Sequence, residues 1–200
     1  MTPVTILRTV ITFLIVLLPR AAAAHLDGSD AGLLNGLMHP VFGPDHLIAM
    51  VSVGVVSVQL GGASLWRLPL AFVSAMTAAA ALGIAQIPLP HTELGIAASV
   101  VVLGIAILVA HSRTSAWPIL VLVLLFGTCH GYAHGLEIPK SVSPALYALG
   151  FVIGTAVLHI AGLVIGEIAS LRSWLWRGLR LAGVAVAASG VLFVAQTVVV

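Results

Sequence analysis

The chain has 200 residues, of which 60% are hydrophobic and only 7% are charged. Soluble domains are about 25% charged, and the eight basic and six acidic residues of this chain cannot solvate the surface of a globule of its size. This composition excludes a soluble enzyme, a disordered segment and a nucleic-acid binder with a basic face. It predicts a multi-spanning protein in contact with membrane lipid, and the single cysteine excludes an intramolecular disulfide.

The first 24 residues have the pattern of a secretory signal peptide. Arg8 supplies a positive charge, residues 10–18 form a short apolar stretch, and alanines 21–24 are small residues suited to signal peptidase. The alternative is an uncleaved first span, but the apolar stretch is short for crossing a bilayer. Cleavage after residue 24 would leave His25 at the N-terminus, where its amine and imidazole form an additional candidate metal ligand.

Six further apolar segments follow, and their connections are too short to separate domains. The sequence therefore predicts an all-α membrane protein, in which residues 25–200 form a single domain of six transmembrane helices. The expected spans are approximately 31–60, 65–87, 92–110, 116–138, 144–169 and 174–199.

The distribution of basic residues predicts the orientation of these spans. Five arginines lie in or close to alternate connections, and Lys140 is the single basic residue of the other connections between these spans. By the positive-inside rule the arginine-containing connections are cytoplasmic. The chain is therefore expected in the bacterial inner (cytoplasmic) membrane as a multi-pass protein, with its mature N-terminus outside.

The first span contains helix-breaking residues and a polar cluster. Pro40, Gly43 and Pro44 predict a broken helix with Pro44 near the first position of its second half, and such breaks are tolerated where they face protein or a polar cavity. The break can direct candidate metal ligands into one cavity. The candidates are His39, Asp45 and His46. Asp45 has a second expected role, in capping the second half-helix or compensating charge at its start.

The fourth span carries a second polar cluster. His130, His134 and Glu137 have the spacing i, i+4, i+7, which places them on one face of a helix. Two imidazoles one turn apart can hold one divalent metal ion, with the carboxylate as a further ligand or an orienting group. The alternative is a hydrogen-bonded polar network that joins helices. Metal binding is favoured because burying all three groups in lipid is otherwise costly.

The expected topology places the two clusters at similar depths, in one chamber open to the exterior. His159 in the fifth span is either an inner ligand or an ordinary core histidine. Glu167 is expected to pair with Arg172. His91 and Glu93 are expected to be solvated in an outer loop, with the gathering of metal ions as the alternative. The opposite directions of spans one to three and four to six suggest an inverted repeat.

The two clusters resemble the motifs of the HupE/UreJ family of hydrogenase and urease accessory membrane proteins. HPVFGPDHLIAMVSVG at 39–54 is similar to the family pattern HPxxGxDHxxAMxxVG, and HGYAHGLEIP at 130–139 is similar to HGxAHGxExP. Pro44 occupies a variable position that is more often apolar. The resemblance implies a nickel or cobalt permease linked to hydrogenase or urease maturation proteins. It also implies that the metal-handling residues are His39, Asp45, His46, His130, His134 and Glu137.

Three functions remain compatible with these residues. The first is a secondary permease for Ni²⁺, or for Co²⁺, because imidazole-rich sites suit these ions. It is expected to have no enzymatic activity and no prosthetic cofactor, and the missing P-loop argues against intrinsic ATP hydrolysis. The second is an intramembrane zinc hydrolase, which the missing HExxH motif disfavours. The third is a metal sensor or an accessory subunit without transport, although the short loops leave little surface for docking. The sequence does not determine the oligomeric state.

Overall fold

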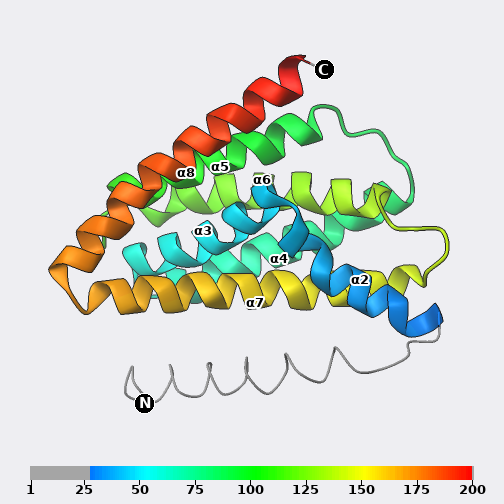
Figure 1. Cartoon of the computed structure of the whole chain (residues 1–200), viewed down its shortest axis with the longest axis horizontal. Coiled ribbons are helices and arrows are strands. Elements are labelled where there is room, and N and C mark those ends of the chain that lie inside the picture. Colours follow the sequence, from blue (N-terminus) through cyan, green and yellow to red (C-terminus); the bar gives the residue numbers. More distant parts are fainter. Residues whose placement is uncertain (1–27, 200) are drawn as a thin grey trace.

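A computed structural model describes residues 28–199, and these residues form only helices and their connections (Figure 1). The expected signal peptide and His25 lie outside the described residues. The seven helices are α2 (Gly28–Phe42), α3 (Pro44–Leu60), α4 (Ser64–Ile84), α5 (Thr92–Val109), α6 (Ala116–Leu136), α7 (Pro144–Ser170) and α8 (Ser173–Val199).

Five of these helices, α4 to α8, are long and apolar enough to cross a membrane. Each begins and ends within three residues of an expected span. A bilayer core about 30 Å thick requires about 20 residues of helix, and these five have 18 to 27. Helices α2, from Gly32 onward, and α3 are long and apolar enough to cross a membrane only when the two are taken together.

The expected break in the first apolar segment is confirmed. Helix α2 ends at Phe42, α3 restarts at Pro44, and the two axes are bent by 82°. Gly43 is the N-cap of α3 and has extended backbone angles, and Pro44 occupies the start of the helix, where its missing N–H costs no hydrogen bond. The bend turns the first residues of α3 into the interior of the bundle.

Helix α3 is the centre of the fold. It contacts every other described helix, and its side chains form much of the apolar core, with Ala49, Met50 and Val56 completely buried. Its N-terminal turn carries Asp45 and His46, so polar groups enter the protein interior at the point where the chain bends. Met50, one turn beyond His46, packs in this core.

Glycines bring the surrounding helices into backbone contact. On α6, a Cβ at Gly131 would collide with the backbone of Met76 on α4, and one at Gly127 would lie 2.6 Å from the Phe72 carbonyl oxygen. On α7, Gly150 makes the same kind of approach to α2, and Gly162 to α3. These glycines therefore set the distances between the helices that carry the polar clusters.

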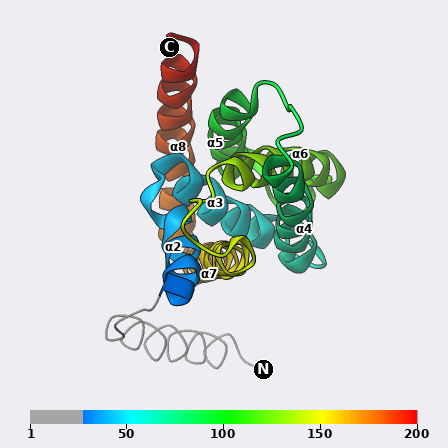
Figure 2. The same ribbon diagram turned by 90° about the vertical axis from the view of Figure 1, so that its right-hand side faces the viewer.

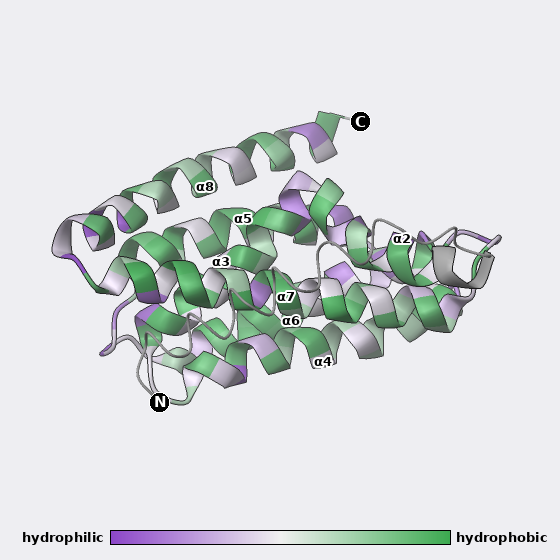
Figure 3. Ribbon diagram, turned by 60° about the horizontal axis from the view of Figure 1, so that its bottom comes forward, coloured by the Kyte–Doolittle hydropathy of each residue, from purple (hydrophilic) through white to green (hydrophobic). Residues whose placement is uncertain are grey.

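The connections alternate between the two ends of the bundle. In Figure 1 the α3–α4, α5–α6 and α7–α8 connections lie at one end, and the α4–α5 and α6–α7 connections lie at the other. Apolar residues dominate the lengths of the helices (Figure 3). Helix α8 lies at the edge of the bundle against α5 (Figure 2) and buries only Gly183 and Gly190 among its described residues.

Candidate metal centre

The polar cluster of α6 lies at the C-terminal end of the helix. His130 and His134 are 0% and 2% exposed, respectively. The His130 Nδ1–H donates to the Phe126 carbonyl oxygen at 2.8 Å, which leaves Nε2 as the unprotonated nitrogen, without a partner among the described residues. An imidazole held in this way presents one lone pair in a fixed direction, as a metal ligand requires.

Glu137 does not lie within the α6 helix, which corrects the simple expectation of one helix face. The helix ends at Leu136 and Glu137 is its C-cap residue. Its carboxylate nevertheless turns back toward the cluster, with Oε2 3.5 Å from His134 Nδ1. The side chain is 48% exposed, so it forms the outer boundary of the site.

The bend between α2 and α3 presents the second polar cluster. His46 Nδ1 donates to Asp45 Oδ1 at 2.8 Å, and the same oxygen accepts the His46 backbone N–H at 2.9 Å. The carboxylate therefore fixes the imidazole tautomer, and His46 Nε2 is buried without a partner among the described residues. Asp45 lies in the first turn of α3, where its charge complements the helix dipole, but the N-cap residue is Gly43.

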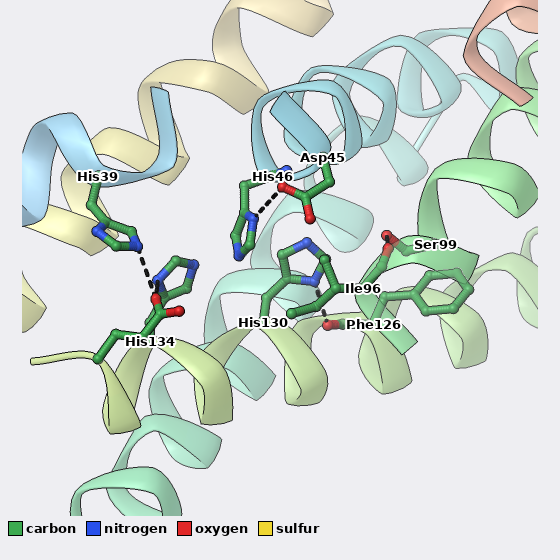
Figure 4. Close-up of polar contacts among 9 residues, drawn as sticks. His39, Asp45, His46, Ile96, Ser99, Phe126, His130 and His134 are labelled. Carbon is green, nitrogen blue, oxygen red and sulfur yellow. Dashed lines mark hydrogen bonds and ion pairs between the residues drawn. The ribbon is translucent and has the colours of Figure 1, made fainter. Parts of the chain in front are cut away.

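The two clusters meet, although nearly a hundred residues separate them in sequence. His39 Nε2 lies 3.0 Å from Glu137 Oε2, and the ring centroids of His39 and His134 are 4.7 Å apart. The His46 ring lies 4.5 Å from that of His134 and 4.9 Å from that of His130 (Figure 4). Four imidazoles thus form a continuous series from the exposed carboxylate to the buried interior.

Three of these groups are already close to the geometry of a metal site. His39, His134 and Glu137 each offer a ligand atom, and these atoms all lie within 4.8 Å of one another. Metal–nitrogen and metal–oxygen bonds of about 2.0–2.2 Å place ligand atoms about 3–4 Å apart, so the spacing of this trio is close to that of ligands that share an ion. His46 and His130 lie beside this trio and extend the set of nitrogen donors inward.

The structure therefore brings together all six residues predicted for metal handling and leaves the additional candidate His159 outside this group. His159 lies on α7 and is 1% exposed, and the ring next to it is that of Phe72. His25 is outside the described residues. The expected Glu167–Arg172 pair is wrong, because the ion pairs of the described residues all involve histidine.

Glu93 lies near this site, whereas the sequence interpretation favoured a solvated loop position for it over a role in gathering metal. It is exposed in the first turn of α5 rather than in a loop, and it lies within electrostatic range of Asp45 and Glu137. The topology could have indicated this position of Glu93, because α5 begins at the same end of the bundle at which α6 ends. Three carboxylates consequently lie near the imidazoles, and their combined negative charge attracts cations.

The fold and the site together define a class: a multi-pass helical membrane protein with histidines and carboxylates clustered at a helix break. A family model described as HupE / UreJ protein matches residues 13–193, which is most of the chain. The chain belongs to the HupE/UreJ family. It is 40% identical over 158 residues to Protein HupE of Rhizobium leguminosarum bv. viciae, a match that covers 78% of this chain and 79% of the relative. No solved structure matches the chain significantly.

Proposed function

We propose that this protein is a secondary permease for nickel ions, with cobalt as the alternative cargo, rather than an enzyme. In this role it would supply metal for the maturation of a hydrogenase or a urease, the processes with which the HupE/UreJ family is associated. Imidazole donors with a few carboxylates suit Ni²⁺ and Co²⁺, whereas Mg²⁺ and Ca²⁺ prefer sites made only of oxygen.

The observation that carries the proposal is the fall in exposure from the outer end of the imidazole series to its interior. Glu137 is 48% exposed and His39 35%, whereas the rings that follow in order of contact, His134, His46 and His130, are 2%, 12% and 0% exposed. Successive rings lie 4.5–4.9 Å apart. Several adjacent sites of moderate strength favour passage, because an ion must leave each site as readily as it enters. One closed tetrahedral cage would instead retain the ion.

We further propose how the chain lies in the membrane. Helices α2 and α3 together form one broken span of a six-span domain, and residues 1–24 are removed as a signal peptide. The α4–α5 and α6–α7 connections then face the exterior, so ions reach Glu137 from outside and move inward toward His130. The inside-negative membrane potential, or exchange for protons, drives the movement.

Uptake in a host without high-affinity nickel transport tests this function. Cells with the wild-type protein should accumulate nickel, and His46→Ala, His134→Ala and Glu137→Ala should each abolish accumulation at equal membrane abundance. Glu167→Ala is the matched control, because Glu167 is an exposed carboxylate that forms no ion pair among the described residues. Its uptake should equal that of the wild type.

The alternatives predict different results in the same experiment. A hydrolase would give no uptake, yet the purified protein would retain one tightly bound metal ion. A sensor or accessory subunit would bind metal but would not move it across sealed vesicles. Either result would refute the transport proposal.

A further inference from the structure

His159 is a buried histidine that the outer cluster does not use. It lies in the interior of α7 and is 1% exposed, and neither ring nitrogen has a hydrogen-bond partner among the described residues. Buried polar groups in proteins are nearly always hydrogen-bonded, because leaving them unpaired costs free energy that an apolar side chain would not. Packing alone therefore does not explain an imidazole at this position.

One aromatic side chain connects His159 to the metal centre. The Phe72 ring is completely buried, and its centroid lies 5.2 Å from that of His130 and 5.2 Å from that of His159. His130 is the most buried member of the imidazole series, and its Nε2 has no partner among the described residues. His159 thus follows directly on the inner end of the series, with the Phe72 ring in contact with both histidines.

Two further donor groups lie about one helical turn from His159. Thr155 is one turn earlier on the same face of α7, is 0% exposed, and donates its hydroxyl hydrogen to Met76 Sδ at 3.6 Å. Met76 is also 0% exposed and lies one turn after Phe72 on α4. His159 lies beside Phe72, and Thr155 lies beside Met76 one turn away, so a nitrogen, an oxygen and a sulfur donor from α4 and α7 lie within about one helical turn of each other.

We propose that His159, with Thr155 and Met76, forms a second, inner binding station for the transition-metal ion. This inference rests on the proposed transport function. Imidazole and thioether ligands select borderline and soft ions such as Ni²⁺, Co²⁺ and copper over hard cations. All three donors are uncharged, so the ion binds more weakly here than beside the carboxylates Asp45 and Glu137. Weak binding suits a station from which the ion is released.

Substitution of His159 tests the contribution of the inner station to uptake independently of the outer cluster. In the His159→Leu variant, nickel uptake should fall by about tenfold or more, while cobalt still binds the purified protein at the outer cluster with unchanged affinity. The control is His111→Leu, which removes an exposed histidine between α5 and α6 and should leave uptake unchanged. Uptake by His159→Leu within about twofold of the wild type would overturn the proposal, as would combined loss of uptake and outer binding.

A direct test does not depend on transport or on the stability of the leucine variant. His159→Cys in a Cys129→Ser background places a thiolate at the station, and Co²⁺ bound there should produce sulfur-to-cobalt charge-transfer absorption. The Cys129→Ser protein alone should show none. A His159→Cys protein that elutes as a folded species yet lacks this absorption refutes the inner station. If the wild type fails to accumulate nickel, the transport proposal fails, and the absorption still decides whether metal reaches His159.

Discussion

Asp45→Asn is the most informative change at the outer cluster, because it alters a charge without altering the size of the side chain. Asp45 accepts the His46 Nδ1–H at 2.8 Å and so leaves His46 Nε2 free to bind metal. An asparagine amide can instead donate to Nδ1, which would place the ring proton on Nε2 and remove its lone pair. Both the charge and the tautomer then oppose metal binding.

The size of the effect follows from the geometry. The Asp45 carboxylate oxygen lies 2.8 Å from His46 Nδ1. The distance across the ring from Nδ1 to Nε2 and a metal–nitrogen bond each add about 2 Å, so an ion bound to Nε2 would lie roughly 7 Å from the negative charge. The attraction of a single negative charge for a divalent ion at this distance is about 1 kcal/mol in water and about 5 kcal/mol at an effective dielectric constant of about 20. The Asp45 side chain is 27% exposed, which places it between these limits. We expect a loss of about 1.4–2.7 kcal/mol, or about 10- to 100-fold in affinity.

Cobalt titration of the purified protein in detergent, followed by calorimetry and visible absorption, measures this loss. Nickel uptake at equal membrane abundance should fall in parallel with affinity. Glu167→Gln is the matched control, because it neutralises a carboxylate of α7 that lies outside the cluster. If Asp45→Asn binds cobalt and transports nickel within about twofold of the wild type, then Asp45 does not orient or charge the site as described.

Two further predictions concern packing and orientation. Gly131→Ala places a Cβ against the backbone of α4 and should destabilise the protein by about 1–3 kcal/mol, seen as a lower thermal unfolding midpoint. The same change at Gly178, where a Cβ meets nothing, should not be destabilising, and equal midpoints for the two variants would contradict the packing argument. In a cysteine-free background, Ser141→Cys in the α6–α7 connection should react with an impermeant maleimide added to intact cells. Ser112→Cys in the α5–α6 connection should react only after lysis, and the opposite pattern would reverse the proposed orientation.

The sequence alone was sufficient for the parts of the fold that local chemistry dictates. A helix that crosses lipid must be long, apolar and internally hydrogen-bonded, so hydropathy located α4 to α8 to within three residues. Proline removes a backbone donor and glycine weakens a helix, so the break at Gly43 was also predictable. Ionisable groups are costly in lipid, and that cost distinguished the two histidine clusters from their apolar surroundings.

Tertiary structure alone decided how these groups are arranged. The 82° bend at Gly43 and the close packing of the glycine-bearing helices set the ring distances that make one series of the imidazoles. Glu93 approaches this site, and Phe72 contacts both His130 and His159, because helices from separate parts of the chain pack at these points. Nothing in the sequence around Phe72 distinguishes it from the other apolar residues of α4, so its contact with two histidines was not predictable. Hydropathy records how each residue interacts with lipid, whereas a contact between helices depends on their rotation and crossing, which only the packed bundle determines.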